Sequence, residues 1–158
     1  MKLFYFLQEL KGVALGYDFR LFTYGPFDSE VLSDLATACS LNQVKESPVT
    51  YSRGYGFDIT AGPHADRLSC ELETNHSVIC SEVDAVIQDF GSFGAAELEL
   101  RSTVLFVDRE FCQVKSAHTS SEIFERVRQI KPHFSDTVIQ ERISEMKGKG
   151  WLQSIASS

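Results

Sequence analysis

The sequence has no two cysteines separated by two residues, so it has no CxxC zinc knuckle. Its four cysteines and four histidines are scattered along the chain, and we expect no structural metal and no cofactor. It also has no apolar run long enough to span a bilayer, because Gln8 and Glu9 interrupt the apolar start. No secretory cleavage site follows that start, so we expect a cytoplasmic protein with free thiols and no membrane partner.

An excess of basic residues is missing as well. Fifteen Lys and Arg stand against 22 Asp and Glu, which gives a net charge of −7. Proteins that bind a phosphate backbone without sequence preference rely on a basic face, so this balance disfavours that function. The nucleophile elbow G-x-S-x-G, the zinc motif HExxH and the phosphate loop GxxxxGK[ST] are all absent. We therefore predict a non-enzymatic protein with no catalytic residues.

What the chain does have is the material for a core. It is 43% hydrophobic, contains 12 Phe and has 158 residues, which suits one compact unit over residues 1–158. Apolar residues three and four apart predict helices over 2–11, 29–40, 83–90, 95–107 and 120–130 and after Ser135. The pattern Thr119-Ser120-Ser121-Glu122 is a capping box for the fifth of these. The predicted fold class is α+β, mostly α.

The strands are fewer and shorter. Alternating side chains predict a strand over 17–24 and a hairpin over 42–60 with its turn near Ser52-Arg53-Gly54. Trp151-Leu152 is predicted to begin a short edge strand. Residues 64–80 leave two interpretations open. We favour a helix through about residue 73, and the alternative is a hairpin over 68–80 that would bring Cys70 opposite Cys80.

The stretch from Tyr24 to Leu32 predicts a defined change of direction. Gly25 and Pro26 are expected to stop the preceding strand, and Asp28 or Ser29 to cap a new helix.

A similar Pro, cap and helix recur from Pro132 to Leu152. Paired helices followed by a small hairpin are typical of a winged helix. We therefore predict winged-helix-like helices with small β-hairpins, arranged in two halves over 1–80 and 94–158, unless the similarity is due to chance.

Two motifs favour nucleic-acid binding. Arg53-Gly54-Tyr55-Gly56-Phe57 matches the first five positions of the RNP1 strand of RNA-recognition domains, although Asp58 departs from it. A glycine-rich wing explains the same residues. The last helix is a candidate DNA-reading helix, although its exposed carboxylates would repel phosphate. Tyr24 has two interpretations. We favour a structural role, in which its ring packs in the core behind Gly25, and the alternative is that it lines a groove with Arg53 and Tyr55 for a partner peptide.

A family resemblance covers most of the chain. Residues 2–8, 17–19 and 24–31 resemble the K-L-x-Y-L-Q-like helix, the aromatic strand and the Y-G-P-[FY]-S motif of YwgA-like proteins of bacteria and archaea. They resemble the Panacea antitoxin-like domain more distantly. Residues 98–104 and 131–135 resemble the later part of YwgA-like sequences.

The resemblance implies little chemistry. YwgA-like proteins have no established activity, and the Panacea relatives are thought to neutralise partner proteins. Tyr24, Gly25 and Pro26 match the shared motif, to which the family assigns no chemical role. This chain departs from the family by starting directly in its first helix, so we expect a partner or a second copy to cover that helix.

Together these observations predict an interaction or regulatory module that binds a protein partner, antitoxin-like in function, or a second copy in a homodimer. The predicted partner-binding residues are Tyr24, Gly25, Pro26, Arg53 and Tyr55. The alternative is a winged-helix transcriptional regulator that binds nucleic acid. A single basic face combining Arg53 with the basic residues of the last two helices would favour this alternative.

Overall fold

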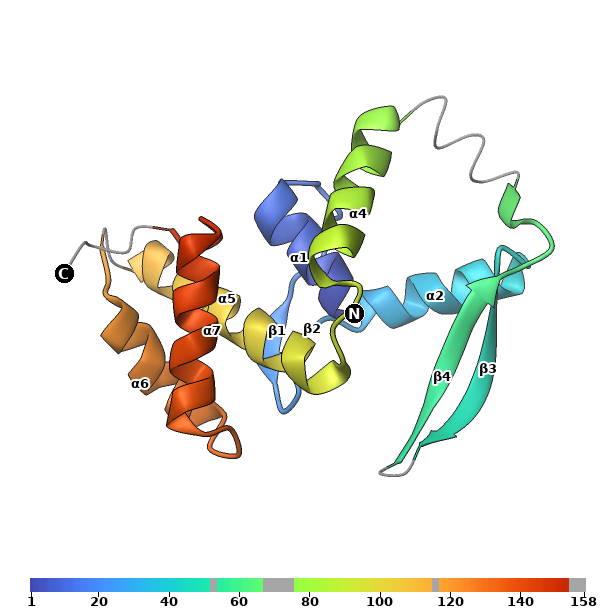
Figure 1. The fold of residues 1–158 in the computed structure, drawn as a ribbon. Helices are drawn as coiled ribbons and strands as arrows, with labels where there is room; N and C mark the ends of the chain where they lie inside the picture. Colours follow the sequence, from blue (N-terminus) through green and yellow to red (C-terminus); the bar gives the residue numbers. More distant parts are fainter. Residues whose placement is uncertain (52–53, 67–75, 115–116, 154–158) are drawn as a thin grey trace. The chain divides into compact units, whose positions relative to one another are not determined.

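The structure is a computed structural model that describes residues 1–51, 54–66, 76–114 and 117–153. Within these residues the fold is α+β and mostly α, with six helices and two separate two-stranded antiparallel sheets (Figure 1). The chain divides into two compact units, Met1–Phe27 with Val86–Ser158 and Asp28–Ala85. The single unit over 1–158 and its sub-halves remain predictions.

The first unit is built around a long buried helix. It contains α1 (Lys2–Lys11), β1 (Arg20–Phe22), β2 (Gly25–Phe27), the end of α4 (Ser77–Phe90), α5 (Ala95–Val114), α6 (Ser120–Ile130) and α7 (Asp136–Gly148). Helix α5 contacts α1, β2, α6 and α7, and its residues Leu100, Val104 and Leu105 are fully buried. Apolar burial of this kind is the main favourable term in folding. Helix α5 therefore organises the unit.

Aromatic stacking joins three distant segments of this unit. Phe6 of α1 stacks on Phe90 of α4, with ring centroids 3.9 Å apart and planes within 6°. Trp151 packs on Phe90 at 4.6 Å. The predicted edge strand at Trp151-Leu152 is therefore wrong. Gly150, at φ 71°, ends α7, and the Trp151 amide donates to the Met146 carbonyl at 3.0 Å, a Schellman-type cap that turns the indole into the core.

The second unit is a helix followed by a hairpin. It contains α2 (Glu30–Ser40), β3 (Val44–Tyr51), β4 (Gly54–Ala61) and the beginning of α4. Strands β3 and β4 pair from Val44 opposite Ala61 to Tyr51 opposite Gly54, which confirms the predicted hairpin. The Gly62 amide donates to the Gln43 carbonyl at 2.9 Å and closes its base. Within the described residues this sheet has two strands, whereas the sheet of an RNA-recognition domain has four.

Several predicted boundaries shift. Helix α5 extends seven residues beyond the predicted end, to Val114, and α4 begins at Ser77. The hairpin alternative over 68–80 is therefore wrong for residues 77–80, and Cys80 is a free thiol in a helix. The favoured helix through residue 73 falls largely on residues 67–75, outside the described part of the chain. Capping is confirmed at Thr119 and at Ser135. At α2 the N-cap residue is Ser29, which makes no side-chain cap bond, and the preceding Asp28 carboxylate accepts from the Glu30 amide at 2.9 Å.

The Tyr24 turn differs most from its prediction. Strand β1 covers only residues 20–22, the turn lies at Thr23-Tyr24, and Gly25 and Pro26 belong to β2 instead of ending a strand. Proline is tolerated because each of these two strands has only one neighbour. Gly25 is required because its φ is 90° and a Cβ there would lie 3.1 Å from Ser102 Oγ and 3.2 Å from Thr103 Oγ1.

This close approach to α5 makes a prediction with a matched control. Gly25→Ala is expected to lower the free energy of unfolding by about 2–3 kcal/mol, because it combines backbone strain with overpacking. Gly16→Ala has a similar φ of 81° but no atom within 4 Å, so it reports the strain alone, about 1 kcal/mol. Urea unfolding of both variants measures the difference. Equal losses would show that the contact with α5 has no energetic role.

Candidate functional site

The β1–β2 hairpin carries three of the predicted partner-binding residues. Tyr24 lies at its turn with 74% of its surface exposed, whereas Gly25 and Pro26 are buried. Two lysine side chains, half-buried Lys2 and buried Lys131, hold this turn in place: Lys2 Nζ donates to the Pro26 carbonyl at 2.6 Å, and Lys131 Nζ donates to the Thr23 carbonyl. Burial, followed by repulsion from Lys131, lowers the pKa of Lys2 to about 8. The favoured prediction that the Tyr24 ring packs in the core is therefore wrong, and of these three residues Tyr24 alone is available for contact.

Tyr55 lies in the other unit, on a different exposed feature. Tyr55, Phe57 and Ile59 alternate along β4 and are 84%, 52% and 54% exposed, and we call them the β4 stripe. Alternate residues of a strand share one face, so all three side chains project from the same side of the hairpin. Across the register they lie opposite Thr50, Pro48 and Glu46 of β3. Arg53, the last predicted partner-binding residue, lies outside the described residues.

The whole net charge of the protein falls in the unit that carries this stripe. Residues 28–85 contain three Lys and Arg and ten Asp and Glu, a net charge of −7. The other unit contains twelve of each and is neutral. An acidic field of this kind attracts basic partners and repels phosphate over about one Debye length, roughly 8 Å at physiological salt. The β4 stripe is therefore an apolar surface on an acidic unit.

The basic residues of the last two helices are largely paired with carboxylates. Arg142 of α7 lies 2.9 Å from Glu97 and 3.3 Å from Glu145, and it shares both with buried Arg101. Burial alone would raise the pKa of Glu97, but hydrogen bonds from Arg101 and Arg142 outweigh it and lower that pKa.

Two further arginines and one lysine of this region are also paired or buried. Arg126 pairs with Glu110, Arg128 pairs with Asp136, and Lys131 is buried. The Lys131 side chain is 1% exposed and so adds nothing to a basic surface. Lys147 and Lys149 near the end of α7 are exposed, and Arg53 lies outside the described residues, so the single basic face of the nucleic-acid alternative stays a prediction.

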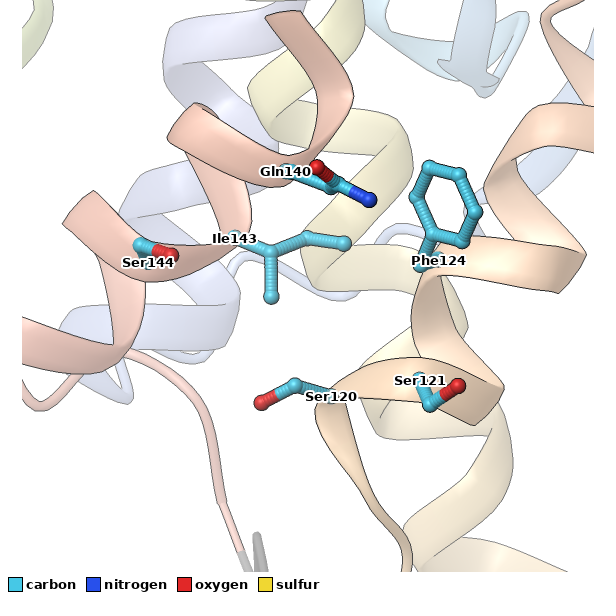
Figure 2. A pocket seen from close by; sticks show the side chains of 6 residues that line it. All are labelled: Ser120, Ser121, Phe124, Gln140, Ile143 and Ser144. Atoms are coloured by element: carbon cyan, nitrogen blue, oxygen red, sulfur yellow. The ribbon is translucent and has the colours of Figure 1, made fainter. Parts of the chain in front are cut away.

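A groove lies between α6 and α7 (Figure 2). Its volume is about 230 Å³, and it is lined by Ser120, Ser121, Phe124, Gln140, Ile143 and Ser144. Phe124 and Ile143 provide its apolar surface. The serine hydroxyls and the Gln140 amide provide its polar surface. It contains no charged side chain, so it offers nothing that would hold a phosphate or a carboxylate by charge.

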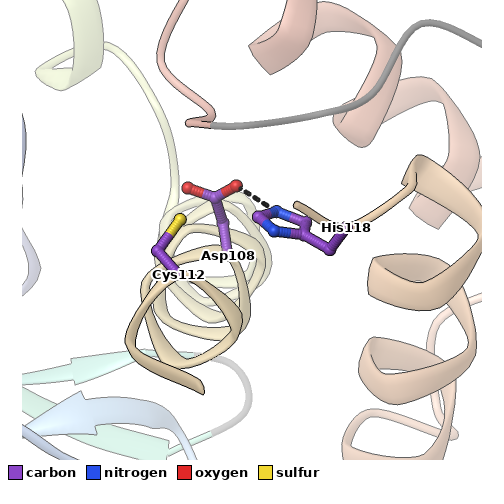
Figure 3. Close-up of side chains that lie close together, drawn as sticks. All are labelled: Asp108, Cys112 and His118. Atoms are coloured by element: carbon purple, nitrogen blue, oxygen red, sulfur yellow. Dashed lines mark hydrogen bonds and ion pairs between the residues drawn. The ribbon is translucent and has the colours of Figure 1, made fainter. Parts of the chain in front are cut away.

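The cluster of chemically versatile side chains lies at the end of α5 (Figure 3). Asp108, Cys112 and His118 bring one carboxylate oxygen, one sulfur and one ring nitrogen within 4.8 Å of one another. His118 Nε2 lies 2.8 Å from Asp108 Oδ1, and both side chains are fully buried. We assign the proton to Nε2, because an ionised carboxylate can only accept.

The surroundings of Asp108 identify what this cluster does. Its carboxylate also accepts from Arg109 and, at 3.0 and 3.2 Å, from the backbone amide of Gln153. Burial, aided by the Asp108 charge, raises the pKa of the Cys112 thiol. A metal ion would have to displace donors from Asp108, and a protonated thiol is a poor nucleophile. The arrangement is a clamp that ties α5 to the start of α6 and to the segment after α7.

Sequence reasoning missed this clamp. The four-residue spacing of Asp108 and Cys112 on a helix was visible, but His118 lies beyond the helix end, where no spacing rule applies. Comparison with protein-family models and with curated proteins finds no match for this chain. Among the helices of the described residues, none has the length and apolar character that crossing a membrane requires.

Proposed function

We propose that the protein is a non-enzymatic regulatory module that binds another protein through the β4 stripe. The observation that carries this proposal is the exposure of Tyr55, Phe57 and Ile59 on one face of a two-stranded hairpin. Exposed tyrosine and phenylalanine are enriched at protein interfaces, where they bury large areas at low entropic cost. A two-stranded hairpin is marginally stable by itself, and a bound partner would stabilise it.

The charge of the unit specifies the partner. The stripe lies on a unit of net charge −7, so its complement is a protein with an apolar pocket bordered by Lys and Arg. The same charge opposes association of two copies through this face. An acidic protein that occupies the basic surface of another would block nucleic-acid binding there, which agrees with the antitoxin-like function that the family resemblance implies.

The nucleic-acid alternative receives less support from the same residues. A winged-helix reader would bring the β3–β4 wing and α7 to the phosphate backbone. The wing belongs to the acidic unit, and Arg142 of α7 is shared between two carboxylates. Both features would weaken binding to DNA or RNA.

Replacement of the stripe tests the proposal. A photo-crosslinking residue at position 55 is expected to capture a basic protein from the native host. The purified partner should then bind Tyr55→Thr/Phe57→Thr about 30-fold more weakly or worse, because exposed aromatic anchors dominate binding energy. Threonine keeps strand propensity, and circular dichroism checks the fold. Affinity is measured by calorimetry over a salt series.

The matched control is Val114→Thr, since Val114 is 79% exposed but lies in the neutral unit. It should bind the partner like the unchanged protein. Retention of full affinity in the double variant would overturn the proposal. Salt-sensitive, micromolar binding of the unchanged protein to duplex DNA or single-stranded RNA would instead favour the alternative.

A further inference from the structure

A second pocket lies in the neutral unit, and its lining includes Arg109, the neighbour of Asp108 in the clamp. It lies between α1, residues 17–19 and α5 and has a volume of about 320 Å³. That size is at the lower end of pockets that bind small molecules. Neither the proposed protein-binding function nor the hydrogen-bonded clamp uses it.

Four aromatic rings line this pocket. Tyr5 and Phe19 meet edge to face at 5.1 Å, and Tyr17 meets Phe19 in the same way at 5.6 Å. Phe106 of α5 lies 6.3 Å from Tyr5. Rings in these orientations present π-faces in several directions, and a π-face attracts a cation.

Three carboxylates line the same pocket, those of Glu9, Asp18 and Glu110. Asp18 and Glu110 have arginine neighbours at solvent-exposed positions, Arg20 and Arg126, and exposed pairs of this kind contribute little energy. A bound cation can therefore replace either arginine beside its carboxylate at a small cost in free energy. The carboxylates and the rings therefore select the same sign of charge.

The one basic side chain in the lining is already used. Arg109 donates to buried Asp108 and to the carbonyls of Glu9 and Trp151, and its Nε lies 3.9 Å from the Glu9 carboxylate. Its charge is therefore balanced from behind the pocket by Asp108. The other charged side chains of the lining are carboxylates, so the pocket disfavours an anionic ligand.

The hydroxyl group of Tyr5 has no hydrogen-bond partner within the described residues, although the side chain is only 2% exposed. Burial, and then the negative charge of Glu9, raises the pKa of this hydroxyl well above its ordinary value, so it stays neutral. Among the described residues the fully enclosed polar atoms without a partner are Arg101 Nε and His118 Nδ1, so the Tyr5 hydroxyl oxygen is not sealed off from solvent. Since Tyr5 lines the pocket, a ligand can supply that partner.

We propose that this pocket binds the ammonium group of a small aliphatic amine. The ammonium would donate to the Tyr5 hydroxyl oxygen and to the Glu9 and Glu110 carboxylates. The rings of Tyr17 and Phe19 would contact its methylene groups and charge. This is a small-molecule site, independent of the β4 stripe.

Calorimetry with putrescine and spermidine tests the proposal on the full chain. We expect binding with a dissociation constant of roughly 1 mM or below and none for 1,4-butanediol, which has a similar carbon chain but no charge. Tyr5→Phe should weaken amine binding about five-fold while leaving urea unfolding unchanged, because the hydroxyl makes no hydrogen bond to any described residue. Tyr24→Phe, which removes an exposed hydroxyl elsewhere, should leave binding unchanged.

Glu110→Gln provides a second variant that does not depend on Tyr5. It should also weaken amine binding, and more so at low salt. Equal affinity for the diol and the diamine, unchanged affinity in Tyr5→Phe, or no binding of either amine at about 10 mM would each overturn the proposal.

Discussion

Replacing Asp108 by alanine is expected to lower the free energy of unfolding by about 4 kcal/mol, because the change leaves the buried His118 and two partly buried donors without an acceptor. His118, Arg109 and the Gln153 amide all donate to this carboxylate. Asp108→Asn should cost less, about 2–3 kcal/mol, because an amide keeps the shape and one acceptor but loses the charge. Both values come from urea unfolding followed by the fluorescence of Trp151, the single tryptophan.

Two control variants separate a clamp from other uses of the cluster. Asp18→Asn removes a carboxylate that is 76% exposed and pairs with Arg20, so it should cost no more than about 0.5 kcal/mol. Cys112→Ser should cost about 1 kcal/mol or less, and zinc should not raise the melting temperature of the unchanged protein. An Asp108→Ala variant within about 1 kcal/mol of the parent, or a clear zinc-induced stabilisation, would contradict the clamp.

The elements that sequence analysis predicted correctly are those whose signals are local. The Thr119 capping box is present with both of its hydrogen bonds, and the Ser135 hydroxyl accepts from the Val138 amide. The β3–β4 hairpin also agrees, because its alternation and its turn lie within twenty residues. Caps and hairpins depend on neighbouring residues, so one sequence is enough to predict them.

The predictions are wrong where contacts with residues distant in the sequence determine the local structure. Gly25 and Pro26 have the composition of a strand terminator, but α5, more than seventy residues later, allows only glycine at position 25. Trp151 has strand propensity, yet Phe90 and the cap of α7 determine its position. Tertiary packing overrides local propensity in both cases.

The candidate site likewise contains features that local sequence predicts and features that depend on the tertiary structure. Tyr55 was identified from the glycine-rich motif, and its exposure on β4 agrees with a role in contacts. The confinement of the net charge to residues 28–85 could not be predicted, because it depends on which segments group into one unit. Asp108 and His118 went unnoticed because each, taken alone, is an ordinary polar residue.

Lys131→Met is expected to have the second large effect, a loss of about 3–5 kcal/mol, because it breaks a buried ion pair from one side. Lys131 is 1% exposed, and its Nζ lies 2.7 Å from Glu99 Oε1 while also donating to the Thr23 carbonyl. Methionine preserves the length and the apolar stem of lysine, so the loss reports the charge and the hydrogen bonds. Thermal and urea unfolding measure it.

Removing both charges isolates the pair. Lys131→Met/Glu99→Leu should regain most of the lost stability, since an apolar pair of similar volume avoids the cost of an uncompensated buried carboxylate. The remaining deficit, about 1 kcal/mol, is assigned to the Thr23 carbonyl, which loses its donor in both variants. A double variant as unstable as Lys131→Met would contradict this partition. It would show that Lys131 stabilises the protein mainly by fixing the turn that presents Tyr24.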